Sequence, residues 1–92
     1  MKIFEKSQTI GILISLYKYG DKMYLTQLFD KLGHKGSLVM GRLNELHNLG
    51  LINDEVEEKF GGRRYIWLTE KGKKVAEHLV EIERIMGEKQ NK

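Results

Sequence analysis

Two short apolar runs at helical spacing lie on either side of a polar turn in the middle of the chain. The first run stops at Gly33, and the second repeats at i, i+4 and i+7 before Gly50. Their apolar positions are Leu28, Phe29 and Leu32, then Val39, Leu43 and Leu46. Two helices joined by about four residues that include glycine are typical of a helix-turn-helix unit. We therefore expect this unit over residues 26–50, with Thr26 as the N-cap of its first helix.

The second helix of this unit turns a polar face outward. At about 100° per residue, the side opposite the apolar row carries Ser37, Gly41, Asn44 and Asn48, with Met40 and Glu45 at its flanks. An amide matches the edge of adenine and a guanidinium matches guanine, so Asn44 and Arg42 are candidate major-groove contacts. Alternatively, Arg42 contacts a phosphate or pairs with Glu45 along the helix. Lys35 and Ser37 are candidate phosphate contacts, and Ser37 is also a candidate helix cap.

Two β-prone segments follow, separated by Gly61-Gly62, and predict a β-hairpin. We expect Arg63 and Arg64 at its tip, where guanidinium groups can enter a narrow minor groove. Residues 51–58 carry four acidic side chains and no Lys or Arg, whereas residues 59–74 carry six basic side chains and one acidic. This change of sign concentrates positive charge in one place, as in elements that contact phosphate. The alternative is a solvated charged hairpin whose arginines touch no ligand.

Helices are also expected at both ends of the chain, over residues 1–20 and 70–87. Thr69 can cap the second of these through its side-chain oxygen, and Glu70 suits its first turn. Each helix carries an apolar face broader than a single exposed helix tolerates. A second copy of the chain would cover these faces in a two-fold interface built from Ile3, Phe4, Ile10, Ile14, Val75, Leu79, Ile82 and Met86. In the alternative, the two helices cover each other within one chain.

The chain of 92 residues fits a single domain, residues 1–92, with an α+β fold that is mostly α. We expect an N-terminal helix (1–20), the helix-turn-helix (26–50), a hairpin (51–69) and a C-terminal dimerisation helix (70–87). Hydrophobic residues make up 40% and charged residues 32% of the chain, a balance typical of soluble globular domains. The absence of cysteine suits the cytoplasm, and no apolar segment is long enough to predict a membrane span.

The sequence gives no support for catalysis or for a bound cofactor. It contains no glycine-rich phosphate loop, no nucleophile elbow and no cysteine nucleophile. Its three histidines are far apart and lack the spacing of a helical metal pair, so we expect neither an enzyme nor a metal site. No motif identifies a small-molecule effector. The formal net charge of +3 is too small by itself to indicate a nucleic-acid partner.

Three segments carry a likeness to a known group of proteins: residues 25–33 (LTQLFDKLG), 43–52 (LNELHNLGLI) and 65–72 (YIWLTEKG). With the predicted order of elements, the chain resembles winged helix regulators of the MarR, ArsR and PadR-like families. The resemblance implies that residues 35–48 enter the major groove of DNA and that residues 59–64 reach the minor groove or backbone. The candidate DNA contacts are Lys35, Gly36, Ser37, Met40, Gly41, Arg42, Asn44, Lys59, Arg63 and Arg64.

Together these features predict a transcriptional regulator that binds double-stranded DNA as a homodimer. Two alternatives stay open. One is a winged helix used for protein interaction, which the apolar Leu38 and Met40 would suit. The other is a sequence-tolerant architectural chromatin protein. DNA binding weakens steeply with salt, whereas binding to a protein through an apolar patch does not, so salt dependence separates the first alternative.

Overall fold

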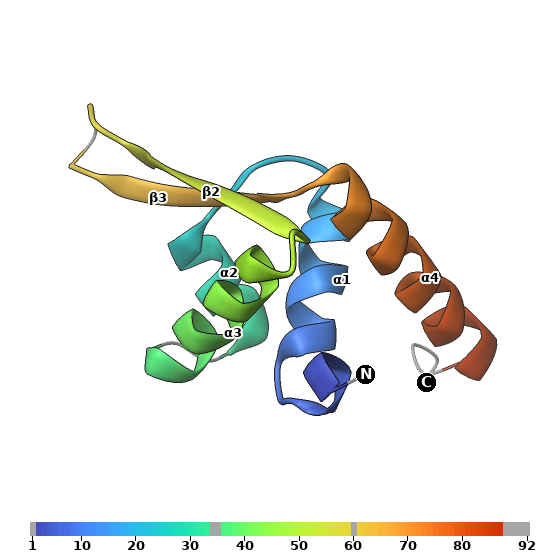
Figure 1. Cartoon of the computed structure of the whole chain (residues 1–92). Helices are drawn as coiled ribbons and strands as arrows, with labels where there is room; N and C mark the ends of the chain where they lie inside the picture. Colours follow the sequence, from blue (N-terminus) through green and yellow to red (C-terminus); the bar gives the residue numbers. More distant parts are fainter. Residues whose placement is uncertain (1, 34–35, 60, 88–92) are drawn as a thin grey trace.

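Four α-helices and a small antiparallel sheet make up the fold, which is described by a computed structural model for residues 2–33, 36–59 and 61–87. The elements are η1 (Lys2–Glu5), α1 (Thr9–Tyr19), β1 (Met23–Tyr24), α2 (Leu25–Leu32), α3 (Ser37–Asn48), β2 (Ile52–Glu57), β3 (Arg63–Leu68) and α4 (Glu70–Met86). Figure 1 shows the β2–β3 hairpin above α1, α2 and α3 and extending past them, while α4 leaves from the other end of the sheet. The predicted α+β winged helix architecture is confirmed. We call the β2–β3 hairpin the wing.

The sheet has the order β1-β3-β2, and both pairings are antiparallel. The register of the wing runs from Ile52 opposite Leu68 to Glu57 opposite Arg63. Since successive side chains of a strand point to opposite faces, one face of the sheet is buried through Met23, Ile52, Ile66 and Leu68. We call this the inner face, and the opposite face the outer face.

The core lies between the inner face of the sheet and the helices. Its fully buried members include Ile12 and Leu13 of α1 and Leu28 of α2. On α3 the row predicted to face inward, Val39, Leu43 and Leu46, is buried. Because these three positions fill one side of α3, the opposite side of that helix is left at the surface.

The N-terminal helix expected over residues 1–20 is interrupted, so that prediction is wrong in its extent. A short 3-10 helix, η1, precedes α1, and Gln8 between them has φ 71° in the left-handed region. A left-handed residue reverses the local path of the chain and cannot continue a helix. Ile3 and Phe4 consequently pack against the core of their own chain.

Two predicted caps differ from the observed ones, and one is confirmed. Helix α2 begins at Leu25, before Thr26, and Gln27 Oε1 accepts a hydrogen bond of 2.9 Å from the backbone N–H of Tyr24. Gly36, at φ 96°, takes the N-cap position of α3 in place of Ser37. Thr69 caps α4 as predicted, since its Oγ1 accepts a 3.0 Å hydrogen bond from the Gly72 N–H. Within the described ranges, no helix has the length and apolarity needed to cross a bilayer.

Candidate nucleic-acid interface

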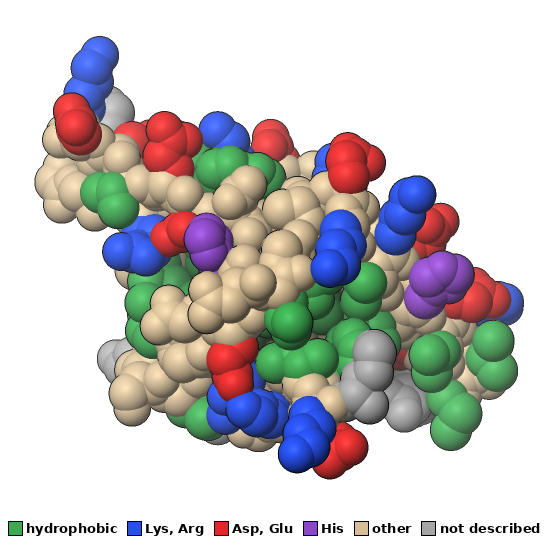
Figure 2. All heavy atoms as spheres, viewed as in Figure 1, with side chains coloured by type: hydrophobic (Ala, Val, Ile, Leu, Met, Phe, Trp, Pro, Cys, Tyr) green, Lys and Arg blue, Asp and Glu red, His purple; other side chains and the backbone are tan. Residues whose placement is uncertain are grey.

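The outward face of α3 is exposed and uncharged. Ser37, Asn44 and Asn48 are exposed along it, and Gly36 is exposed at its start. Figure 2 shows the surface over α3 as largely tan, between groups of charged side chains. Lys35, another predicted contact, lies outside the described residues. Met40 is half-buried and packs against the core, so it contributes only part of its surface to this face.

Gly41 lies in the middle of this face, and no contact within the described chain requires a glycine there. It lies within α3 at an ordinary helical φ, and a Cβ added to it would meet no atom of the described chain within 4 Å. A glycine inside a helix costs about 1 kcal/mol relative to alanine. What the missing side chain provides is access, because another molecule can approach the backbone of α3 closely here.

Arg42 is turned away from the outward face and held by its own chain. Its Nε donates to the backbone carbonyl of Ser7 at 2.9 Å, and its Nη1 donates to Glu45 Oε1 at 2.6 Å. Only 17% of the side chain is exposed. The structure therefore favours the alternative in which Arg42 pairs with Glu45, and it does not place Arg42 where it can contact guanine.

Glu45 is contacted by a second cation from the N-terminal segment. Lys6 Nζ donates to Glu45 Oε2, while Arg42 holds the other carboxylate oxygen. The hydrogen bond from Lys6 has the larger effect and that from Arg42 the next, and together they lower the pKa of Glu45 below its ordinary value of 4.5. The carboxylate is therefore ionised at neutral pH, and it joins the segment between η1 and α1 to the flank of α3.

The wing arginines lie in β3 and not at the tip of the hairpin, so their predicted position is corrected. Arg63 is opposite Glu57 and Arg64 is opposite Val56 in the ladder. The register leaves the positions after Glu57, including Lys59, which is exposed, to make the turn. Being adjacent in a strand, the two arginines point to opposite faces. Arg63 stacks on the outer face with its Cζ 5.4 Å from the ring centre of Tyr24.

Arg64 lies on the inner face, on the same side as α3. Its Nη1 donates to Asp54 Oδ2 at 2.7 Å, and the other oxygen of Asp54 lies 3.7 Å from His47 Nε2 of α3. These side chains border a hollow of about 200 Å³ between α3 and the wing. The full lining is Met40, Leu43, Asn44, His47, Ile52, Asp54, Arg64 and Ile66. Sequence analysis missed Asp54, although alternation along β2 and β3 puts it on the same face as Arg64.

The outer face of the sheet carries an aromatic row that sequence analysis also missed. Tyr24 and Tyr65 meet edge to face at 6.0 Å, and Lys22 Nζ lies 4.8 Å from the ring centres of both Tyr65 and Trp67. Tyr65 donates its hydroxyl to Glu55, which raises the pKa of Tyr65, with burial adding to the effect. These contacts occupy the outer face and brace the wing.

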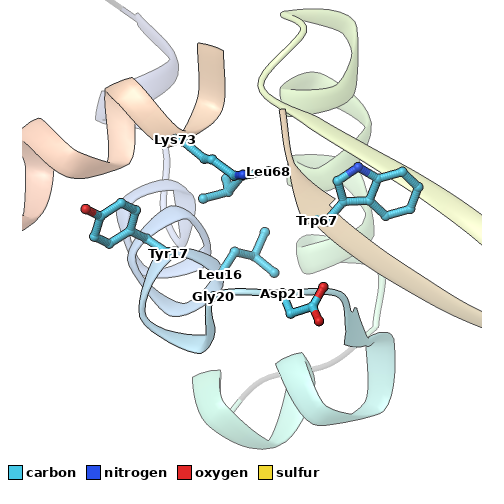
Figure 3. A pocket seen from close by; sticks show the side chains of 7 residues that line it. All are labelled: Leu16, Tyr17, Gly20, Asp21, Trp67, Leu68 and Lys73. Carbon is cyan, nitrogen blue, oxygen red and sulfur yellow. The ribbon is translucent and has the colours of Figure 1, made fainter. Parts of the chain in front are cut away.

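A second hollow lies behind the wing, between the end of α1 and the start of α4. It measures about 230 Å³ and is lined by Leu16, Tyr17, Gly20, Asp21, Trp67, Leu68 and Lys73. Figure 3 shows Leu16 and Leu68 between Tyr17 on one side and Trp67 on the other. None of these lining residues belongs to α3, so this hollow is separate from the surface of that helix.

Of the eight residues predicted for dimerisation, four pack against the core, one is half-buried and three are exposed. Ile3, Phe4, Val75 and Leu79 pack against the core of their own chain, as the intramolecular alternative requires. Ile14 is half-buried and Ile10 is exposed. At the end of α4, Ile82 is 55% and Met86 is 65% exposed, and Ile85 beside them is 68% exposed.

The described residues contain no group of three His, Asp or Glu side chains able to hold a metal ion.

Comparisons with known proteins give structural relatives only. No protein-family model and no curated protein matches the chain. A structure from Porphyromonas gingivalis described as a MarR-family transcriptional regulator matches at 23% identity and TM-score 0.84, covering 97% of this chain and 86% of that one. A transcriptional regulator homologue from Pyrococcus horikoshii matches at 16% identity and TM-score 0.78, covering 99% and 90%.

A third relative is MepR of S. aureus in a structure bound to an oligodeoxyribonucleotide. It matches at 25% identity and TM-score 0.75 over 89% of this chain. The chain spans 60% of that MepR chain and 63% of MepR in another structure, less than two thirds in each. From these likenesses, the chain has the winged helix fold that is found in MarR-family transcriptional regulators.

Proposed function

We propose that the protein is a DNA-binding transcriptional regulator that inserts α3 into the major groove of duplex DNA. The observation that carries this proposal is the exposed, uncharged face of α3 with Arg64 of the wing on the same side. An α-helix with its side chains is about 10–12 Å across, and the major groove is about 12 Å wide. The structure of the relative MepR with an oligodeoxyribonucleotide adds support from the same fold. We assign the protein no enzymatic role and place its action in the cytoplasm.

Within the groove, Asn44 is the proposed base-reading residue. Its amide can pair with N6 and N7 of adenine, and it is exposed on the outward face of α3. Gly41, one turn earlier on that face, lets the helix backbone lie close to the base edges. Lys35, Gly36 and Ser37, at the start of α3, are the proposed contacts to a phosphate at the helix N-terminus.

On the wing, Arg64 and Lys59 are the proposed contacts to the neighbouring backbone or minor groove. Arg64 is poised on the α3 side of the hairpin and Lys59 is exposed in its turn. Arg63 stacks on Tyr24 on the outer face and has no assigned contact. This division between two adjacent arginines supplies a matched pair of variants.

The test compares Arg64→Gln with Arg63→Gln in fluorescence anisotropy titrations of a labelled random duplex at about 50 and 200 mM salt. Arg64→Gln removes a phosphate contact and also exposes the carboxylate of Asp54, so affinity falls and the salt slope decreases by about 1. Arg63→Gln, with the same loss of charge, stays close to the wild type. Wild-type protein that binds no duplex, or binds it without salt dependence, would contradict the proposed function.

A protein-interaction module is the second candidate function. Leu38 at the start of α3 and Val56 on the wing are both exposed, large and apolar. This candidate predicts no salt-dependent DNA binding at all, and the same titration therefore separates it from the first. Selection of bound fragments from a random DNA pool then distinguishes a regulator from an architectural protein, because only a regulator enriches a common sequence.

We further propose that the regulator is a homodimer. The exposed Ile82, Ile85 and Met86 give the end of α4 an apolar stripe, and an apolar stripe rimmed by polar residues is typical of protein interfaces. The start of α1, with the exposed Ile10, lies at the same end of the molecule (Figure 1). A two-fold axis beside α4 would present two α3 helices to two half-sites about one DNA turn apart.

A further inference from the structure

The flank of α3 that lies away from the wing is bordered by cations from the N-terminal segment. Lys6 contacts Glu45 on this flank. A hollow of about 310 Å³ opens beside it, lined by Lys2, Ile3, Lys6, Glu45, Asn48 and Leu49. Asn48 belongs to the outward face of α3, so Lys2 and Lys6 border the same face that Arg64 borders from the other side.

The N-terminal segment is fixed in this place by several contacts. The left-handed Gln8 turns η1 back along the helices, and Ile3 and Phe4 pack against the core. Arg42 binds the backbone carbonyl of Ser7 at 2.9 Å, which ties the segment directly to α3. A phosphate contact made from here would not have to order a loose chain end, so it would cost little conformational entropy.

The charges on this flank sum to a cationic surface. Lys6 and Arg42 share one carboxylate, that of Glu45, and Lys2 is exposed at the edge of the hollow. Glu5 of the same segment does not line the hollow. Arg64 lies on the wing side of α3, and Lys2 and Lys6 lie on the opposite side. The uncharged outward face of α3 therefore has cations along both of its flanks. Both walls of a DNA groove are lined by phosphates, so a helix lying in the groove meets phosphate on each side.

We infer that residues 2–6 form a further phosphate-contacting element of the DNA interface, with Lys2 and Lys6 as its contacts. This inference rests on the proposed function and adds an element that neither the sequence pattern nor the wing supplies. Glu45 has two effects in this arrangement. It positions Lys6 beside α3 in the unbound protein, and it competes with the phosphate for the same ammonium group.

The experiment measures the salt dependence of DNA binding for Lys2→Gln/Lys6→Gln against Lys73→Gln/Lys74→Gln, a control with the same charge change on α4. Each lysine–phosphate contact contributes about 0.9 to the slope of log affinity against log salt. The Lys2/Lys6 variant is expected to lose about 1.8 of slope per subunit. For each bound subunit, the wild type then loses about tenfold more affinity than this variant between about 50 and 200 mM salt. The α4 control keeps the wild-type slope.

The Glu45→Gln variant is expected to change DNA affinity in the opposite direction from the Lys2/Lys6 variant. Removing the competing carboxylate is expected to raise DNA affinity, whereas a purely structural role for the Lys6–Glu45 pair would leave affinity unchanged or lower it. If the Lys2/Lys6 variant matches its α4 control while Arg64→Gln still weakens binding, the inference is overturned and the proposed function stands. If the wild type shows no salt-dependent binding, the proposed function fails first.

Discussion

Glu45 acts in this structure both as a link between segments and as a regulator of local charge. It accepts hydrogen bonds from Lys6, of the N-terminal segment, and from Arg42, on its own helix. Arg42 in turn binds the carbonyl of Ser7. The best sequence candidate for reading guanine is therefore used to hold the chain together, and the charge near the outward face of α3 comes from other residues.

The lowered pKa of Glu45 predicts how stability responds to acid. Because its folded-state pKa lies below the ordinary value of 4.5, its stabilising contribution is present at pH above that value and is lost as pH falls through the folded-state pKa. We expect the Tm of Glu45→Gln to fall less than that of the wild type when circular-dichroism melts are compared between about pH 6 and pH 3. Glu77→Gln, on an exposed side of α4, is the control; equal acid sensitivity in both variants would refute the assignment.

Among the elements, α3 and α4 are joined by a set of contacts around the LTEKG segment. Thr69 donates from its backbone N–H to the carbonyl of Leu51 at 3.1 Å and from its hydroxyl to the carbonyl of Gly50 at 2.6 Å. Lys71 Nζ donates to the carbonyl of Leu49 at 3.0 Å. The start of α4 thus satisfies the carbonyl groups that follow α3, and it fixes the angle between the two helices.

Gly72 is the residue of this junction that tolerates no side chain. A Cβ at Gly72 would lie 1.9 Å from the carbonyl oxygen of Leu51, which is backbone and cannot move aside. We expect Gly72→Ala to cost about 3 kcal/mol, at the upper end for overpacking. At about 4–8 °C per kcal/mol for a domain of this size, the Tm measured by circular dichroism falls by roughly 12–24 °C.

Gly41→Ala is the matched control, since Gly41 has open space around it and an ordinary helical conformation. Alanine in a helix interior is favoured by about 1 kcal/mol over glycine, so this variant gains stability. Similar Tm losses at Gly41 and Gly72 would show that the contact with Leu51 does not set the requirement for glycine.

Periodicity was sufficient to place most elements whose contacts are local, whereas capping rules were right for Thr69 and wrong for Thr26 and Ser37, since Tyr24 and Gly36 take those N-cap positions. The apolar rows of α2 and α3, the Thr69 cap and the hairpin around Gly61 and Gly62 all follow from short-range rules, and the structure contains them. The errors at the candidate site occur where partners come from far along the chain. Arg42 meets Ser7, which lies 35 residues away, and the facing of Arg63 and Arg64 depends on a strand register that composition does not specify. Lys2 and Lys6 carry no local pattern, and only the turn at Gln8 brings them to α3.

At the scale of the whole molecule, the end of α4 carries a group of large apolar side chains that its own chain leaves exposed. Figure 2 shows apolar side chains gathered over its last part, where Ile82, Ile85 and Met86 are exposed. The first part of α4 is already covered by its own chain through Val75 and Leu79. Intramolecular packing therefore accounts for the first half of this helix, and the proposed dimerisation concerns its last part.

Ile85→Lys tests the proposed dimer at a position where the fold is not at risk, because the side chain is 68% exposed. A buried unpaired ammonium group is unfavourable in an interface, so we expect this variant to shift toward monomer in light scattering coupled to size-exclusion chromatography. Glu77→Lys, which adds the same side chain at another exposed position of α4, should keep the wild-type mass. A monomeric wild type, or equal masses for the two variants, would rule out the proposed interface.

Because Arg64 is paired opposite Val56, a one-residue shift of β3 at this position would move the Arg64 side chain to the other face of the sheet. A residue inserted between Glu57 and Arg63 lengthens the turn and leaves the alternation of β3 intact. The same insertion between Arg64 and Leu68 rotates the guanidinium by half a period, to the side where Tyr24 lies, while the helices keep their places. A one-residue insertion before Arg63 therefore leaves Arg64 on the α3 side of the hairpin, whereas the same insertion after Arg64 removes it from the proposed contact between wing and DNA.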